Sequence, residues 1–76
     1  LNTTQTLSLG MNSELVVTAQ RLLKNLGYFP SDIDTTGYFG TITRTATVDF
    51  QAANSIQQLG IIGPQTRTRL NELGCS

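Results

Sequence analysis

Apolar residues recur along residues 13–26 at the spacing of one face of a helix. Intervals of four, three and four positions separate the residues of this stripe, which are Leu15, Ala19, Leu22 and Leu26, with Val16 and Leu23 beside them. This spacing predicts an amphipathic helix. Asn12 or Ser13 is placed to cap its first N–H groups. Gly27 is expected to follow the last turn, where a left-handed residue commonly ends a helix.

Two patterns later in the chain predict two more helices. Over residues 41–53 the stripe expected to be buried consists of Ile42, Ala46, Phe50 and Ala53. Over residues 64–73, Pro64 suits the first helical position, where a missing N–H costs nothing, and Leu70 and Leu73 are the expected buried residues. No segment alternates apolar and polar residues over a length that would predict a strand. The pattern therefore predicts an all-α fold, a small three-helix bundle.

The chain enters the second and third predicted helices through similar turns. The pattern Gly-x-x-Gly-x-x-Thr-Arg-Thr begins at Gly37 and again at Gly60, which is 23 residues later. Internal repeats define the architecture of a domain, and glycine favours the tight or left-handed backbone of such turns. We therefore expect two similar Gly-x-x-Gly turn-helix units. Phe39 and Phe50 are expected in the core, because a domain this small must bury nearly all its large apolar residues.

Polar, Thr-rich residues occupy the start of the chain and show no periodicity. We expect residues 1–8 to form a tail or the end of a linker, residues 9–73 to form the domain, and residues 74–76 to form a C-terminal tail. Leu7 or Leu9 is expected to make the first contact with the core. Residues 31–36 are expected to form a polar loop held to the core by Ile33. The two aspartates of this loop lack the later ligands of a calcium loop.

Composition narrows the possible functions. The 76 residues include five basic and five acidic residues, so the net charge is zero and only 13% of the chain is charged. Binding to nucleic acid, or to a membrane surface through a basic face, needs an excess of positive charge. No apolar run is long enough to span a membrane. We therefore expect neither of these partners, and we expect a ligand met by neutral hydrogen-bonding groups and a few aromatic faces.

Histidine is absent from the chain, and Cys75 is the single cysteine. These facts exclude a nucleophile activated by histidine, a zinc site of histidine and cysteine, and a disulfide within the chain. We expect no catalytic residue, no metal and no cofactor, and we expect Cys75 to be an unreactive thiol. The chain begins with Leu1 rather than Met, so a targeting segment is expected to be absent from it.

A set of residues spread over the three predicted helices and their turns forms a recognisable order. It comprises Leu9-Gly10, Gln20, Leu22-Leu23, Leu26-Gly27-Tyr28, Gly37-Tyr38-Phe39-Gly40, Thr43, Ala46, Phe50-Gln51, Gly60-Ile61-Ile62-Gly63-Pro64, Thr66 and Leu70. In this order and at these spacings the set resembles the peptidoglycan-binding domain 1 family, a three-helix module found beside bacterial cell-wall hydrolases. No single piece is specific, but the whole set covers nearly the entire chain.

The resemblance implies a non-catalytic module that binds peptidoglycan and anchors an attached protein or hydrolase to the bacterial wall. It also implies fusion to a larger protein, a monomer, and an extracytoplasmic location, whether secreted, periplasmic or associated with the wall. Thr36 and Leu59 depart from the family, which commonly has Asp before the first glycine of each turn. Thr36 is expected to hold its turn through its hydroxyl.

These departures keep an alternative open, a protein-interaction or structural module of the same fold that has lost wall binding. An exposed apolar patch that includes Ile61, Ile62 or Tyr28 would favour this alternative, because a monomer seldom leaves a large apolar patch uncovered.

The candidate ligand-binding residues lie near the turns and are Tyr38, Thr41, Arg44, Gln20 and Tyr28. The tyrosines offer an aromatic face for a sugar and a hydroxyl for hydrogen bonds. Arg44 has a planar guanidinium that suits a stem-peptide carboxylate, and Thr41 lies at a helix N-terminus, which favours anions. Gln20 and Gln51 have a second interpretation, in which the side-chain amide satisfies the backbone of a turn.

Overall fold

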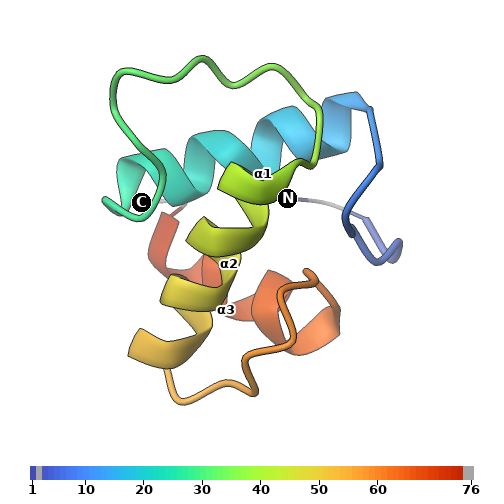
Figure 1. The fold of residues 1–76 in the computed structure, drawn as a ribbon. Coiled ribbons are helices and arrows are strands. Elements are labelled where there is room, and N and C mark those ends of the chain that lie inside the picture. Colours follow the sequence, from blue (N-terminus) through green and yellow to red (C-terminus); the bar gives the residue numbers. More distant parts are fainter. Residues whose placement is uncertain (2, 75–76) are drawn as a thin grey trace.

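Three helices account for the regular secondary structure of residues 1 and 3–74, which the computed structural model describes. They are α1 (Glu14–Asn25), α2 (Thr41–Ala53) and α3 (Pro64–Gly74). Figure 1 shows α1 lying across one end of α2, in a domain that measures 26 × 25 × 24 Å. The predicted all-α three-helix fold is confirmed. The second helix has the predicted bounds, and the first and third differ from prediction by one residue at their ends.

Local sequence explains where α1 begins and ends. The Ser13 hydroxyl accepts a hydrogen bond from the Val16 N–H at 3.4 Å, which makes Ser13 the N-cap. Glu14 lies in the first turn and Lys24 in the last, so each charge complements the nearer end of the helix dipole. Beyond the helix, Gly27 has a φ of +89°, the left-handed conformation expected there.

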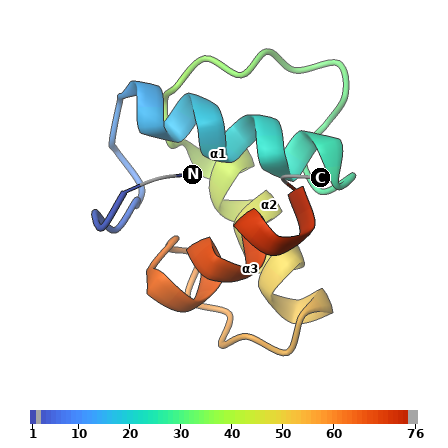
Figure 2. The same cartoon turned by 180° about the vertical axis from the view of Figure 1, so that it is seen from behind.

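Helix α1 packs against both other helices and forms one side of the core. Figure 2 shows the C-terminal turn of α3 reaching α1 from below. The approach is close, since a Cβ added to Gly74 would lie 2.8 Å from the Leu22 side chain. The buried apolar side chains are Leu7, Val16, Ala19, Leu22, Leu23, Phe29, Phe39, Ala46, Phe50, Ile56, Ile62 and Leu70. The expected burial of Phe39, Phe50 and Leu70 is therefore confirmed.

The buried face of α2 differs from the predicted stripe. Ile42 is 44% exposed and Ala53 is exposed, so the prediction is wrong at both ends of the helix. Thr43, Thr47 and Gln51 are buried instead. Polar side chains are stable in the core when their hydrogen-bonding groups have partners, and the Thr47 hydroxyl donates to the Thr43 carbonyl at 2.8 Å.

The other two helices show smaller differences of the same kind. On α1, Val16 and Leu23 are fully buried, whereas Leu15 and Leu26 pack only against the edge of the core. On α3, Leu73 is 38% exposed although it was expected to be buried. Each helix is therefore turned slightly about its axis relative to the face that its apolar residues define.

The N-terminal segment joins the domain through two short antiparallel pairings. Leu7 is fully buried and exchanges backbone hydrogen bonds of 3.0 and 2.8 Å with Ile62. Gly10 and Met11 form backbone hydrogen bonds, both 2.8 Å long, with the turn before α2. Leu9 is 55% exposed, so Leu7 rather than Leu9 lies in the core, and Leu1 also packs against the core. A domain boundary after residue 8 leaves Leu7 outside the domain.

Asn2, Cys75 and Ser76 lie outside the described residues, and so does the prediction made for Cys75. Within the described part of the chain, no helix combines the length and the apolar character that a membrane crossing requires. The same residues contain no group of three or more acidic or cysteine side chains arranged to hold a metal ion.

Candidate functional site

The side-chain amide of Gln20 holds together the turn before α2. Gln20 is 1% exposed. Its Oε1 atom accepts a hydrogen bond from the Gly37 N–H at 2.9 Å. Its Nε2 atom donates to the Tyr38 carbonyl at 3.0 Å and to the Thr43 hydroxyl at 2.9 Å. Both N–H bonds of the amide are used in this way, so the second interpretation of Gln20, as a residue that satisfies a turn, is confirmed.

Gly37 allows this turn to lie directly on α1. Its φ is +89°, and an added Cβ would lie 2.8 Å from the Val17 Cγ2 atom and 3.0 Å from the Ser13 carbonyl oxygen. The next two residues point to opposite sides, as in any extended segment: Phe39 is fully buried and Tyr38 is 52% exposed. The turn therefore presents the Tyr38 ring to solvent from a fixed backbone.

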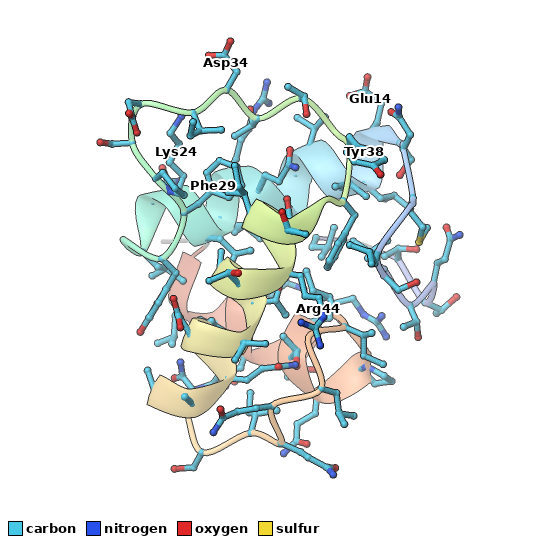
Figure 3. All side chains as sticks on the ribbon, in the orientation of Figure 1. Glu14, Lys24, Phe29, Asp34, Tyr38 and Arg44 are labelled. Carbon is cyan, nitrogen blue, oxygen red and sulfur yellow. The ribbon has the colours of Figure 1, made fainter. Side chains whose placement is uncertain are left out.

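Thr36 helps to hold the same turn. Its hydroxyl accepts a hydrogen bond from the Tyr38 N–H at 3.3 Å, so the prediction that Thr36 acts through its hydroxyl is confirmed. The preceding loop is fixed to α1 at Ile33, whose carbonyl accepts a hydrogen bond of 2.6 Å from the Lys24 ammonium. In Figure 3 the loop passes over the N-terminal end of α2, with Asp34 pointing away from the domain.

Two adjoining hollows flank the N-terminal half of α2, and we call them together the α2 groove. One has a volume of about 280 Å³, has Gln20 at its base, and is lined on its surface by Tyr38 and Asp34. The other, of about 290 Å³, is lined by Tyr28 and Asp49. Thr41 and Ile42 line both hollows, so the two tyrosines belong to different halves of one surface.

The α2 groove is aromatic, hydroxylic and free of basic side chains among its lining residues. Its charged lining residues are Asp34 and Asp49. Gly40, the N-cap of α2, makes no side-chain cap hydrogen bond, so the first N–H groups of α2 and its positive dipole end meet the groove at Thr41. Tyr28 is braced by an edge-to-face contact with Phe50, with ring centroids 5.4 Å apart.

Arg44 lies outside the α2 groove. It is exposed, and its stem packs over the second turn, where a Cβ added to Gly60 would lie 3.0 Å from both the Arg44 Cγ and Nε atoms. Figure 3 shows Arg44 near the chain that leads into α3, well away from Tyr38. The structure therefore brings Tyr38, Thr41 and Tyr28 to one surface, places Gln20 beneath it, and leaves Arg44 apart.

Sequence reasoning did not indicate Ile42, Asp34 or Asp49 as groove residues. Ile42 belongs to an apolar period that predicts burial, and its exposure depends on the rotation of α2. Asp34 and Asp49 line the groove without a pattern in the sequence that connects them. Ile62, by contrast, is fully buried, and Ile61 and Tyr28 are partly buried, so these residues do not form the exposed apolar patch that would favour a protein-interaction module.

Comparison with known proteins agrees with this architecture. Residues 12–70 match the family model of the peptidoglycan binding domain. Carboxy-terminal processing protease CtpB of Bacillus subtilis (strain 168) is 38% identical over 66 residues, which cover 87% of this chain and 13% of the protease. This chain therefore corresponds to a small part of that relative.

Two solved structures share the fold. The crystal structure of the SleB N-terminal domain superposes with a TM-score of 0.89 at 26% identity, covering 95% of this chain and 96% of that one. A peptidoglycan-binding protein from Clostridioides difficile, in complex with glutamine hydroxamate, gives a TM-score of 0.87 at 34% identity, covering 97% of this chain and 45% of that one. The chain belongs to the peptidoglycan binding domain family and is a peptidoglycan-binding module.

Proposed function

We propose that this module binds the glycan strand of peptidoglycan in the α2 groove and anchors an attached protein to the wall without catalysing a reaction. The observation that carries the proposal is the half-exposed Tyr38 ring, held over the groove by the hydrogen bonds of Gln20. A binding ring on a fixed backbone loses little conformational entropy when a ligand binds.

The chemistry of the groove suits a neutral sugar better than an anion. The apolar faces of sugar rings stack on aromatic side chains, and the tyrosine hydroxyls add hydrogen bonds. Asp49 and the Thr41 hydroxyl are placed to bond sugar hydroxyls. No lysine or arginine lines the groove to pair with a carboxylate. Because Tyr38 and Tyr28 lie in adjoining hollows, the surface fits a ligand longer than one sugar ring.

A weak single site is sufficient for such an anchor. Peptidoglycan is an insoluble polymer with many equivalent sites, so a tethered module rebinds at high effective concentration. The match to 13% of the CtpB chain supports a role as one module of a larger protein. The bacterial wall lies outside the cytoplasmic membrane, so the proposal places the module there, acting as a monomer.

Replacing Tyr38 tests the proposal. We expect Tyr38→Ala to weaken pelleting of the chain with purified sacculi about fivefold, because the stacking surface is lost, while Tyr38→Phe stays within about twofold. Leu9→Ala is the matched control, since Leu9 is similarly exposed, at 55% against 52% for Tyr38, and does not line the α2 groove.

The free energy of unfolding of all three variants should remain within about 0.5 kcal/mol of the parent chain, as is usual for exposed positions. Equal pelleting of Tyr38→Ala and Leu9→Ala would remove the α2 groove as the site. A parent chain that stays in the supernatant, while another wall-binding module pellets, would contradict wall binding itself and support the alternative of a protein-interaction module.

A further inference from the structure

The internal repeat reproduces the whole hydrogen-bonded turn a second time. Gln51, which is 1% exposed, accepts from the Gly60 N–H at 3.0 Å and donates to the Ile61 carbonyl at 2.9 Å and the Thr66 hydroxyl at 3.0 Å. The partners of Gln20 are the residues 23 positions earlier, namely Gly37, Tyr38 and Thr43. The interpretation of Gln51 as the residue that satisfies a turn is thereby confirmed.

The repeat also reproduces the groove. Two hollows of about 230 and 500 Å³ flank the start of α3 and share Ile56, Pro64 and Gln65. We call them together the α3 groove. Pro64 and Gln65 stand where Thr41 and Ile42 join the two halves of the α2 groove, 23 residues earlier.

The two grooves differ in chemistry at equivalent positions. Tyr38 is replaced by Ile61, and Ala46 is replaced by Arg69. The α3 groove has no aromatic lining residue, and its smaller hollow carries the side-chain amides of Gln57 and Gln65 beside the apolar Leu59. Its larger hollow carries a basic group, Arg69, which the α2 groove lacks, together with the carboxylate of Glu72. A sugar ring therefore has no stacking partner here, whereas an amide chain has both hydrogen-bonding and apolar partners.

The arginine in the larger hollow is held in place but retains free donors. Arg69 donates from Nε to the Asn54 side-chain oxygen at 3.2 Å. Its Nη1 atom lies 3.8 Å from a Glu72 carboxylate oxygen, and the two side chains are 45% and 59% exposed. Exposed pairs at such a distance are weak. A guanidinium has five N–H donors, so Arg69 can also bind a ligand carboxylate.

We propose that the α3 groove binds the peptide part of the same polymer, a short amide chain with small alkyl side chains and a carboxylate directed at Arg69. The inference rests on the proposed function, because it assigns the peptide to one groove of a module whose other groove takes the glycan. Leu59 and Ile56 contact the alkyl groups, the glutamine amides bond the peptide groups, and Arg69 pairs with the carboxylate.

Titration of the ¹⁵N-labelled 76-residue chain tests this assignment. The probes are N-acetyl-alanyl-alanine, in its L,L and D,D forms, and the corresponding C-terminal amide. We expect the acid of at least one form to shift the NMR signals of Gln57, Gln65 and Arg69 and not those of Tyr38 and Thr41. The amide is expected to bind about fivefold more weakly, the scale of an exposed ion pair.

Arg69→Gln should abolish the preference for the acid over the amide. Arg21→Gln, a change of another exposed arginine that lines neither groove, should keep that preference. Shifts confined to Tyr38 and Thr41, no shifts with either form, or an unchanged preference in Arg69→Gln would overturn the inference.

Sacculus pelleting separates this inference from the function on which it rests. If the parent chain pellets through Tyr38 but no peptide shifts the α3 groove, the inference fails and the proposed function stands. If the peptides bind the α3 groove but Tyr38→Ala pellets like the parent chain, the glycan assignment fails and the peptide site stands.

Discussion

Gln20 and Gln51 show how one residue type serves both turns of this domain. Each side chain reaches from a helix into the turn that follows it and satisfies a backbone N–H, a backbone carbonyl and a threonine hydroxyl. A buried amide that makes all three bonds stabilises the turn, whereas its removal takes the partner from a buried backbone N–H and from a buried threonine hydroxyl. The hydrogen bonds therefore give both glutamines a role in folding. The residue type alone does not decide this, because a glutamine near a binding surface can also contact a ligand.

We expect Gln20→Ala to lower the free energy of unfolding by about 3 kcal/mol, because buried groups left without a partner cost about 1–3 kcal/mol each. Gln58→Ala is the control, since Gln58 is exposed, and its effect should stay within about 0.5 kcal/mol. Urea denaturation of both variants gives the comparison. Equal stability of the two variants would show that the Gln20 hydrogen bonds contribute nothing to the fold.

Among elements, the turn before α2 determines where the groove lies. It packs so closely on α1 that no side chain fits at Gly37, where an added Cβ would lie 2.8 Å from Val17. The same φ of +89° occurs at Gly27, where nothing lies within 4 Å of an added Cβ. These two glycines therefore separate the cost of a left-handed backbone from the cost of a steric clash.

We expect Gly27→Ala to cost about 1 kcal/mol, the strain of a left-handed backbone in a residue with a Cβ. Gly37→Ala is expected to cost at least about 2 kcal/mol, because overpacking adds to that strain. Gly37→Ala should also weaken sacculus pelleting, since the turn that carries Tyr38 must move. Thermal or urea unfolding measures the first effect, and equal losses for the two variants would contradict the close packing of this turn.

Across the whole molecule, residues 7–11 connect the two repeated units. Leu7 pairs with Ile62 in the second turn, and Met11 pairs with Phe39 in the first. Phe39 and Ile62 are fully buried, and so is Leu7. The N-terminal segment thus fixes the two turns, and with them the two grooves, relative to each other.

Leu7→Ala is expected to lower the free energy of unfolding by about 3 kcal/mol, as for other fully buried leucines. Leu9→Ala should change it by less than about 0.5 kcal/mol, because Leu9 is 55% exposed. Denaturant unfolding distinguishes the two. A small effect at Leu7 would mean that the segment is a dispensable tail, as its polar composition predicts.

Much of the fold follows from local features that the sequence displays. Helix bounds follow from the apolar period, Ser13 and Pro64, and the similarity of the two turns follows from the spacing of their glycines. These features act through neighbouring residues, through caps, backbone conformation and i to i+4 hydrogen bonds, so they are visible without knowledge of distant contacts. The sequence also indicates Tyr38 as an exposed aromatic candidate beside a helix N-terminus.

Only the tertiary structure decides how the helices are turned and which candidates share a surface. The face of α2 that is buried carries Thr43 and Gln51, which hydrogen-bond to Gln20 and Thr66, and Ile42 lies in the groove instead of the core. Arg44 lies over the second turn because Gly60 leaves room for its stem. Both outcomes depend on contacts between residues far apart in the chain, whose energies outweigh the local periodicity.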